Sequence, residues 1–416
     1  MMSLYSKKIY GLMMSELSIM GPYQIDRVCK TVDVNPYLIT EKDLPRLAKE
    51  LSRVVLAYKG PERAKSFAEK FEMLHDMDTL IAGERNTDRR IEYLLNLGDL
   101  QRLIGGWDRA QKYYLDVLDI STEKEKYLFL CKANRKLGSM HAMLSDFQKS
   151  SEFLTQAQEN TQNFRNKKEK ARLRREWAYL DWRQGRLESS LKHIEEALHL
   201  LENGKNERLI GELMIRRSSV LTDMGRQDDA IDELKSAISI LERNNDILNL
   251  SRAYNNMGVI FKYQNKYEEA IENYKHSLKA ANETESPRAK AYPLANSAEC
   301  YVKIGDIETA RRNAEEATNI FISLGERFML ARLKIVDALL LDADGNQEEA
   351  EKSLLQGLEA FEDLDIPSDY AWELYEAGLL FKKWKRKEAH TYFDKAAKTF
   401  QKIGNKAMAD IVNKSR

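Results

Sequence analysis

The sequence predicts an all-α protein made of repeated helix pairs. Charged residues make up 32% of the 416 residues and only seven residues are proline, which is typical of many short, solvated helices. Small residues also recur at a period of 40 residues. Such a period indicates that copies of one helical unit are stacked in a row, because no single unit could bury its apolar face alone.

Two columns of small residues define the period. The first column contains Ala110, Ser150, Ser190, Ala230, Ala270, Ala310 and Ala350, and Ala389 lies one residue short of the next step. The second column lies twelve residues earlier and contains Gly98, Gly138, Ala178, Ser218, Gly258, Ala298 and Ala338. Two helices can approach to about 8–10 Å only where the residues at the crossing are small. We therefore expect these columns to form the contact between the two helices of each pair.

Residues 1–80 do not follow the period, and we expect them to form a helical N-terminal capping region. They predict three helices, near 23–33, 41–58 and 61–75. Thr40 followed by Asp43 resembles a capping box. Gly60 followed by Pro61 is typical of one helix ending and the next beginning. A cap would cover the apolar face of the first repeat.

The alternative for this region is a DNA-binding head of three helices on a repeat sensor, which would make the protein a transcription regulator. No recognition-helix pattern is visible, and basic residues are interleaved with acidic ones. The formal net charge of zero gives no general argument for nucleic acid or for a membrane surface. These observations favour the cap over the DNA-binding head.

The repeats themselves resemble the tetratricopeptide repeat. Small residues occupy the eighth, twentieth and twenty-seventh positions, turn glycines occur in "QGRLESS", "MGRQDDA", "IGDIETA" and "DGNQEEA", and "AYNNMGVIFKYQNKYEEAIENY" is the closest copy. The resemblance implies a right-handed superhelix, an α-solenoid of about eight helix pairs over residues 81–403, whose concave face binds other proteins. The period exceeds the usual 34 residues. In this the chain is similar to kinesin light chains, Pins-type regulators and peptide-sensing regulators of the Rap and PlcR kind.

The C-terminal end is basic. From Lys382 to Arg416 there are 11 lysines or arginines against three acidic residues. End repeats need a polar outer face, so we expect residues 404–416 to form a C-terminal capping segment. The alternative is a contact for an acidic partner.

The resemblance also implies which residues face inward on the first helix of each repeat. Carrying its inward positions over to the second, third and fifth repeats gives Lys132, Arg135, Arg172, Arg175, Tyr179, Trp182, Arg183, Arg252, Asn255, Lys262 and Tyr263. This set is basic and aromatic, which would suit a protein or peptide partner with acidic and apolar residues. The alternative is that the arginines pair with glutamates of the chain itself.

Catalysis has little support in the sequence. The six histidines are scattered, and His193 and His199 are six residues apart, which places them on different faces of a helix. No phosphate loop, nucleophile elbow or dinucleotide fingerprint is present. We expect no enzyme activity, metal site or cofactor.

The compartment is expected to be the cytoplasm. The longest apolar stretches fall far short of the ~20 residues that a membrane span needs, and the first residues lack a signal-peptide pattern. Cys29, Cys131 and Cys300 are far apart, which favours reduced thiols over a disulfide or a metal site. The sequence therefore predicts a protein-binding module that acts as a scaffold, adaptor or sensor.

Overall fold

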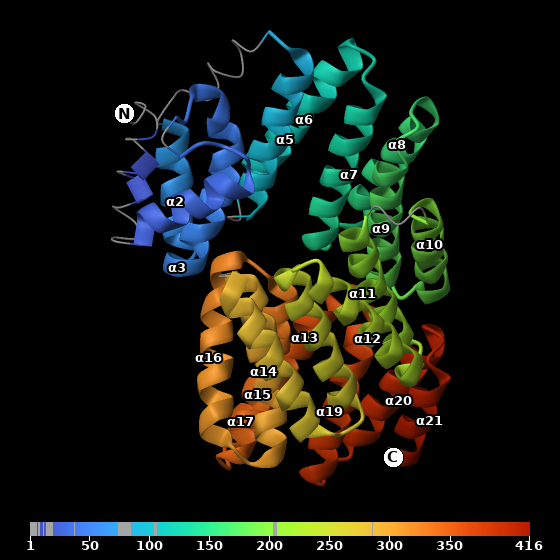
Figure 1. Cartoon of the computed structure of the whole chain (residues 1–416). Helices are drawn as coiled ribbons and strands as arrows, with labels where there is room; N and C mark the ends of the chain where they lie inside the picture. The colour runs from blue at the N-terminus through green and yellow to red at the C-terminus, as the bar shows by residue number, and fades with distance from the viewer. Residues whose placement is uncertain are drawn as a thin grey trace. The chain divides into compact units, whose positions relative to one another are not determined.

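The structure is a computed structural model of the chain, and Figure 1 shows its helices in order. It describes residues 6, 9–10, 12–13, 20–36, 38–73, 85–103, 106–202, 206–284 and 286–416. All regular elements within these ranges are helices, so the predicted all-α fold class is confirmed. No helix of the described part is long and apolar enough to cross a membrane.

Eight helix pairs follow the N-terminal helices. The N-terminal part contains α2 (Met20–Thr31), the short 3₁₀ turn η1 (Glu41–Asp43) and α3 (Leu44–Met73). The pairs are α5 (Thr87–Leu103) with α6 (Trp107–Glu123), α7 (Tyr127–Met143) with α8 (Phe147–Asn160), α9 (Lys167–Arg183) with α10 (Leu187–Leu200), α11 (Glu207–Asp223) with α12 (Gln227–Arg243), α13 (Ile247–Tyr263) with α14 (Tyr267–Thr284), α15 (Pro287–Ile304) with α16 (Ile307–Leu324), α17 (Arg327–Ala343) with α18 (Gln347–Glu362) and α19 (Pro367–Lys383) with α20 (Glu388–Lys402). The 3₁₀ turn η2 (Thr161–Asn163) follows α8, and α21 (Lys406–Ser415) ends the chain.

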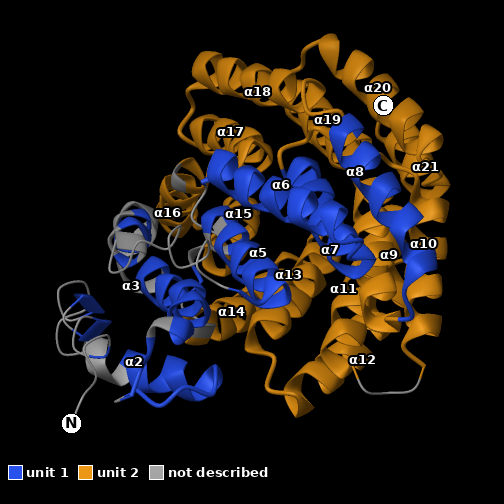
Figure 2. Ribbon diagram, turned by 90° about the horizontal axis from the view of Figure 1, so that it is seen from above, with its two compact units in different colours: residues 1–143, 148–165, 284–287 blue, residues 144–147, 166–283, 288–416 orange. Residues whose placement is uncertain are grey.

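The chain divides into two compact units (Figure 2). Unit 1 consists of residues 1–143, 148–165 and 284–287, and unit 2 consists of residues 144–147, 166–283 and 288–416. The pairs from α9/α10 to α19/α20, together with α21, therefore belong almost entirely to unit 2.

Small residues allow the two helices of a pair to pack closely, as the period predicts. All members of the first column are buried, and those from Ala110 to Ala350 have no solvent exposure. In the second column, a Cβ atom on Gly258 would lie 2.5 Å from the ring of Tyr274. Real Cβ atoms do not approach a neighbour so closely, so only glycine allows this crossing.

The period of 40 is also visible in the backbone of the turns. One residue with a positive φ angle lies within the connection between the first and second helices of seven consecutive pairs: Ser145, Gly185, Gly225, Asn265, Gly305, Gly345 and Lys385. This left-handed conformation is free of steric cost for glycine and costs about 1 kcal/mol or more for other residues. The left-handed backbone of these turns therefore explains why four of the seven residues are glycine.

One expectation for the N-terminal region is wrong. Gly60 and Pro61 do not separate two helices, because α3 continues through them as one helix. Proline inside a helix costs about 3 kcal/mol. Here the apolar residues on both sides of the proline, including Leu51, Val55 and Phe67, are fully buried in one cluster. This shared burial offsets the cost of the proline.

The capping contact at Thr40 is present. The Asp43 carboxylate accepts hydrogen bonds from the Thr40 backbone N–H at 2.8 Å and from the Thr40 hydroxyl at 2.7 Å. The Thr40 carbonyl in turn accepts from the backbone N–H of Asp43 at 3.0 Å. These bonds fix the entry into η1 and α3.

Candidate functional site

The first helices of the pairs line the inner face of unit 2. Figure 2 shows α11, α13, α15, α17 and α19 toward the inside of the curve, with α12, α18 and α20 outside them. Side chains from successive inner helices meet across this face. Glu299 of α15, for example, accepts from Lys262 of α13 at 2.7 Å and from Arg332 of α17 at 3.2 Å.

Several polar side chains of neighbouring inner helices bond at an interval of 37 residues. Arg175 donates to Glu212, and Asn249 donates to Glu212 at 3.4 Å. Lys262 and Glu299 have the same separation. In unit 1 the interval recurs between Lys136 and Asp99 at 2.5 Å. The interval is three residues shorter than the period of 40. Each of these side chains therefore bonds a residue about one helical turn before its own equivalent in the next repeat.

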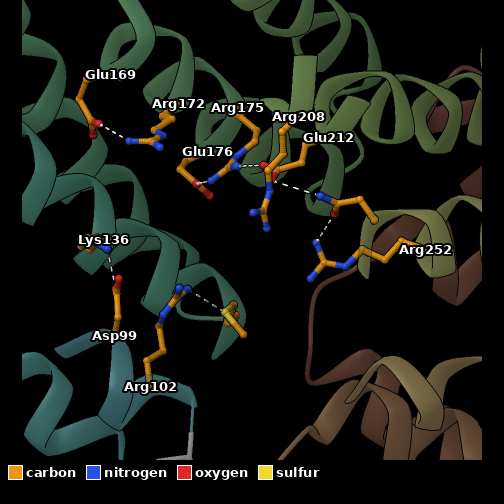
Figure 3. A network of polar contacts seen from close by, with 12 residues as sticks. Asp99, Arg102, Lys136, Glu169, Arg172, Arg175, Glu176, Arg208, Glu212 and Arg252 are labelled. Carbon is orange, nitrogen blue, oxygen red and sulfur yellow. Dashed lines mark hydrogen bonds and ion pairs between the residues drawn. The ribbon is translucent and has the colours of Figure 1, made fainter. Parts of the chain in front are cut away.

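The charged groups on the N-terminal halves of α9, α11 and α13 form a connected network (Figure 3). Arg175 donates to Glu212 and also to Glu176 at 2.6 Å. Arg208 contacts Glu212 at 3.7 Å and Asp246 at 3.1 Å. Each of these carboxylates is thus bonded to at least one arginine, so this part of the inner face is held together by charge-assisted hydrogen bonds.

Two further arginines lie beside this network. The Arg216 guanidinium lies over the ring of Tyr179 at 4.7 Å and over the ring of Trp182 at 4.8 Å. Arg252 donates to Asn249 Oδ1 at 3.2 Å and is exposed to solvent. Burial and the nearby charges of Arg252 and Arg175 lower the pKa of Arg216 to about 10. The Arg252 side chain reaches solvent, but the helices around it reduce its hydration, and this, with the charges of Arg288 and Arg175, lowers its pKa.

The C-terminal ends of the same helices contact the far end of the repeat array. Tyr263 of α13 stacks on Trp372 of α19 with ring centroids 3.7 Å apart and planes 3° apart. Arg183 of α9 lies over the ring of Phe328 of α17 at 4.9 Å and donates to Tyr179 Oη at 3.3 Å. At these ends the inner face is therefore covered by α17 and α19.

The surroundings of two buried carboxyl groups in this region shift their pKa values in opposite directions. Trp182 Nε1 donates to Asp223 Oδ2 at 2.7 Å. Burial and Asp369 nevertheless raise the pKa of Asp223 to about 8. Burial would also raise the pKa of Glu299, but Lys262 and Arg332 outweigh it and lower that pKa to about 2. Asp223 is therefore a neutral acid near pH 7, and Glu299 is an ion.

The residues that the sequence predicts for a partner site divide between the two units. Lys132 and Arg135 belong to α7 in unit 1, where Lys132 lies over the Phe129 ring at 4.6 Å and Arg135 is buried. The other nine lie in unit 2. Arg172 pairs with Glu169 at 3.3 Å, and Asn255 accepts from Asn296 at 3.0 Å.

Pairing within the chain, the alternative left open by the sequence, therefore occurs for several of these residues. Arg175 pairs with two glutamates and Lys262 with Glu299. Sequence reasoning omitted Arg216, because it lies one residue beyond the inward position that Ile215 occupies. One sequence feature could have indicated Arg216: it is a charged residue on α11, and the preceding inner helix, α9, carries Tyr179 and Trp182.

Comparisons with known proteins agree with the repeat pattern. Family models described as tetratricopeptide repeat match residues 249–323 and 94–126. A comparison with curated protein sequences finds no significant match.

Several solved structures are similar to this chain in fold. A Rap protein complexed with Competence and Sporulation Factor is 14% identical over 88% of this chain and 99% of its own, with a TM-score of 0.63. The Rap conjugation gene regulator of plasmid pLS20, in complex with the Phr* peptide, is 14% identical over 88% of this chain and 97% of its own, with a TM-score of 0.62. NprR in complex with its cognate peptide NprX is 15% identical over 79% of this chain and 98% of its own, with a TM-score of 0.52.

At this level of identity the similarities concern the fold alone. The repeat period, the eight helix pairs and the two matching family segments all lead to one assignment. The chain therefore contains tetratricopeptide repeats, which the family models match at residues 94–126 and 249–323.

Proposed function

We propose that the inner face of unit 2 binds an extended peptide segment of a partner protein, and that the chain works as a scaffold, adaptor or sensor. The observation that carries this proposal is the set of solvent-accessible guanidinium groups and aromatic rings on α9, α11 and α13. Arg216 lies against Tyr179 and Trp182, and Arg252 is exposed beside them in the network. The solved proteins of similar fold support it, because two of those compared above are complexes with a peptide.

The proposed segment is acidic and apolar. Arginine forks bind carboxylates in a bidentate way, and aromatic rings anchor apolar side chains at low entropy cost. The C-terminal ends of α9 and α13 are already covered by α17 and α19. The segment therefore contacts mainly the N-terminal and central parts of the inner helices, up to the rings of Tyr179 and Trp182 that face Arg216.

The transcription-regulator alternative is not proposed. It requires a basic DNA-binding surface on the N-terminal helices, where acidic residues such as Asp26 and Glu50 lie beside Arg27 and Arg53. A capping role for residues 1–80 and 404–416 stays a prediction from the sequence.

The test is a binding experiment with the intact chain. The chain is mixed with a random library of short synthetic peptides, separated by gel filtration, and the retained peptides are identified by mass spectrometry. We expect retention of a defined subset of peptides that contain acidic and apolar residues. A chain that retains no peptide while giving a cooperative melt would refute the proposed function.

A further inference from the structure

Four arginines from four successive inner helices lie within electrostatic range of one another. They are Arg175 of α9, Arg216 of α11, Arg252 of α13 and Arg288 of α15. The positive charges of Arg175 and Arg252 act on Arg216, and those of Arg175 and Arg288 act on Arg252. Like charges repel at such range, so a cluster of this kind needs anions to balance it.

Two members of the cluster have their anions within the chain. Arg175 is bonded to Glu176 and Glu212. Arg288 Nε contacts Glu326 Oε1, and the second oxygen of Glu326 accepts from the Tyr292 hydroxyl at 2.8 Å. Both guanidinium groups are therefore neutralised locally.

The other two members have no carboxylate at ion-pair distance among the described residues. Arg216 is contacted by the two rings of Tyr179 and Trp182, and Arg252 by the neutral amide of Asn249. An aromatic ring contacts the flat face of a guanidinium and leaves the N–H donors at its edge free. The edge donors of Arg216, and those of Arg252 that do not bond Asn249, contact no carboxylate within the described residues and can bind a ligand.

The balance of charge indicates the kind of anion. Four arginines stand against the three glutamates Glu176, Glu212 and Glu326, and the nearby Arg208 and Asp246 cancel each other. One positive charge remains. A carboxylate carries a single negative charge and matches this excess, whereas a phosphate carries nearly two.

We propose that Arg216 and Arg252 form a subsite that binds one carboxylate of the peptide ligand, with Tyr179 and Trp182 as the apolar wall beside it. This inference rests on the proposed function and adds the ligand group that the site selects. The carboxylate has two possible sources in a peptide, an Asp or Glu side chain and the C-terminus.

The experiment uses the intact chain and two forms of the random library, one with free C-terminal carboxylates and one with C-terminal amides. The double variant Arg216→Gln, Arg252→Gln removes both charges and keeps polar side chains of similar length. The control is Arg243→Gln, at an exposed arginine of α12 that bonds only the Ser239 carbonyl. Melts followed by circular dichroism establish that all chains are folded.

We expect the wild-type chain and the control to retain peptides that bear a carboxylate roughly tenfold more than peptides without one. The double variant should lose this preference and still retain apolar peptides weakly. If the carboxylate is the C-terminus, the preference disappears with the amidated library. If it is a side chain, Asp or Glu is enriched at one position in both libraries.

The outcomes separate the subsite from the proposed function. Peptides retained by the wild-type chain without any carboxylate preference would overturn the subsite and leave peptide binding intact. A double variant that keeps the preference for carboxylates would also overturn the subsite and leave peptide binding intact. If the wild-type chain retains no peptide from either library, peptide binding itself is refuted and the subsite with it.

Discussion

Replacing Asp223 with Asn should make the stability of the chain less sensitive to a rise in pH between about 4 and 8. Asp223 is 9% exposed, and burial together with Asp369 raises its pKa from 3.8 to about 8. The folded chain therefore keeps a proton that the unfolded chain loses above about pH 4. This group contributes stability below pH 4, and the contribution is lost as the pH rises toward 8.

The size of the effect follows from the pKa shift. One proton held only by the folded state changes the free energy of unfolding by about 1.4 kcal/mol per pH unit. Between about pH 5 and pH 8 the wild-type chain should therefore lose up to about 4 kcal/mol relative to Asp223→Asn. The amide oxygen of Asn can still accept from Trp182 Nε1, so the hydrogen bond at 2.7 Å need not be lost.

The assay is urea unfolding of both chains at several pH values across this range. The control is Asp228→Asn, at an exposed carboxyl group of α12. Its stability difference from the wild-type chain should stay nearly constant with pH. A constant difference for Asp223→Asn as well would refute the conclusion that this carboxyl group is protonated in the folded chain.

Two other substitutions test the packing and the network. Gly258→Leu should destabilise unit 2 by on the order of 1–3 kcal/mol or more, because even a Cβ atom there meets the Tyr274 ring at 2.5 Å; an unchanged melting temperature would contradict the register of the repeats. Arg175→Glu should cost on the order of 3 kcal/mol, since it removes the arginine that bonds Glu176 and Glu212 and adds a like charge beside them; urea unfolding measures this, and Arg175→Gln should cost less.

The packing within each pair could be predicted from the sequence because it depends on local geometry. A small residue at a helix crossing has the same meaning in every repeat, as the buried Ala230 and the contact of Gly258 with Tyr274 show. The backbone of α3 could not be predicted in the same way. Gly60 and Pro61 favour a break locally, and only the shared apolar cluster on both sides keeps the helix continuous.

The inner face could be predicted only in part. The family's inward positions identify Arg175 and Tyr263 as candidates, but their partners depend on the stagger between neighbouring helices and on the curvature of unit 2. The Arg175–Glu212 bond needs the interval of 37 residues, and the stack of Tyr263 on Trp372 needs four helix pairs, from α13/α14 to α19/α20, to curve together. Curvature is the sum of small rotations between repeats, and a single sequence carries no direct signal for it.

The interval of 37 residues between several bonded side chains limits how the array can change by loss or gain of a module. Removing 40 residues that include Glu212 would bring Gly258 into the place of Ser218, so the close helix crossing would survive. The same deletion would bring Arg252 opposite Arg175, where the glutamate had been. One repeat can therefore replace another without changing the helix crossing, but not without changing the charge pairs on the inner face. The charges of the inner face depend on the order in which the repeats are joined.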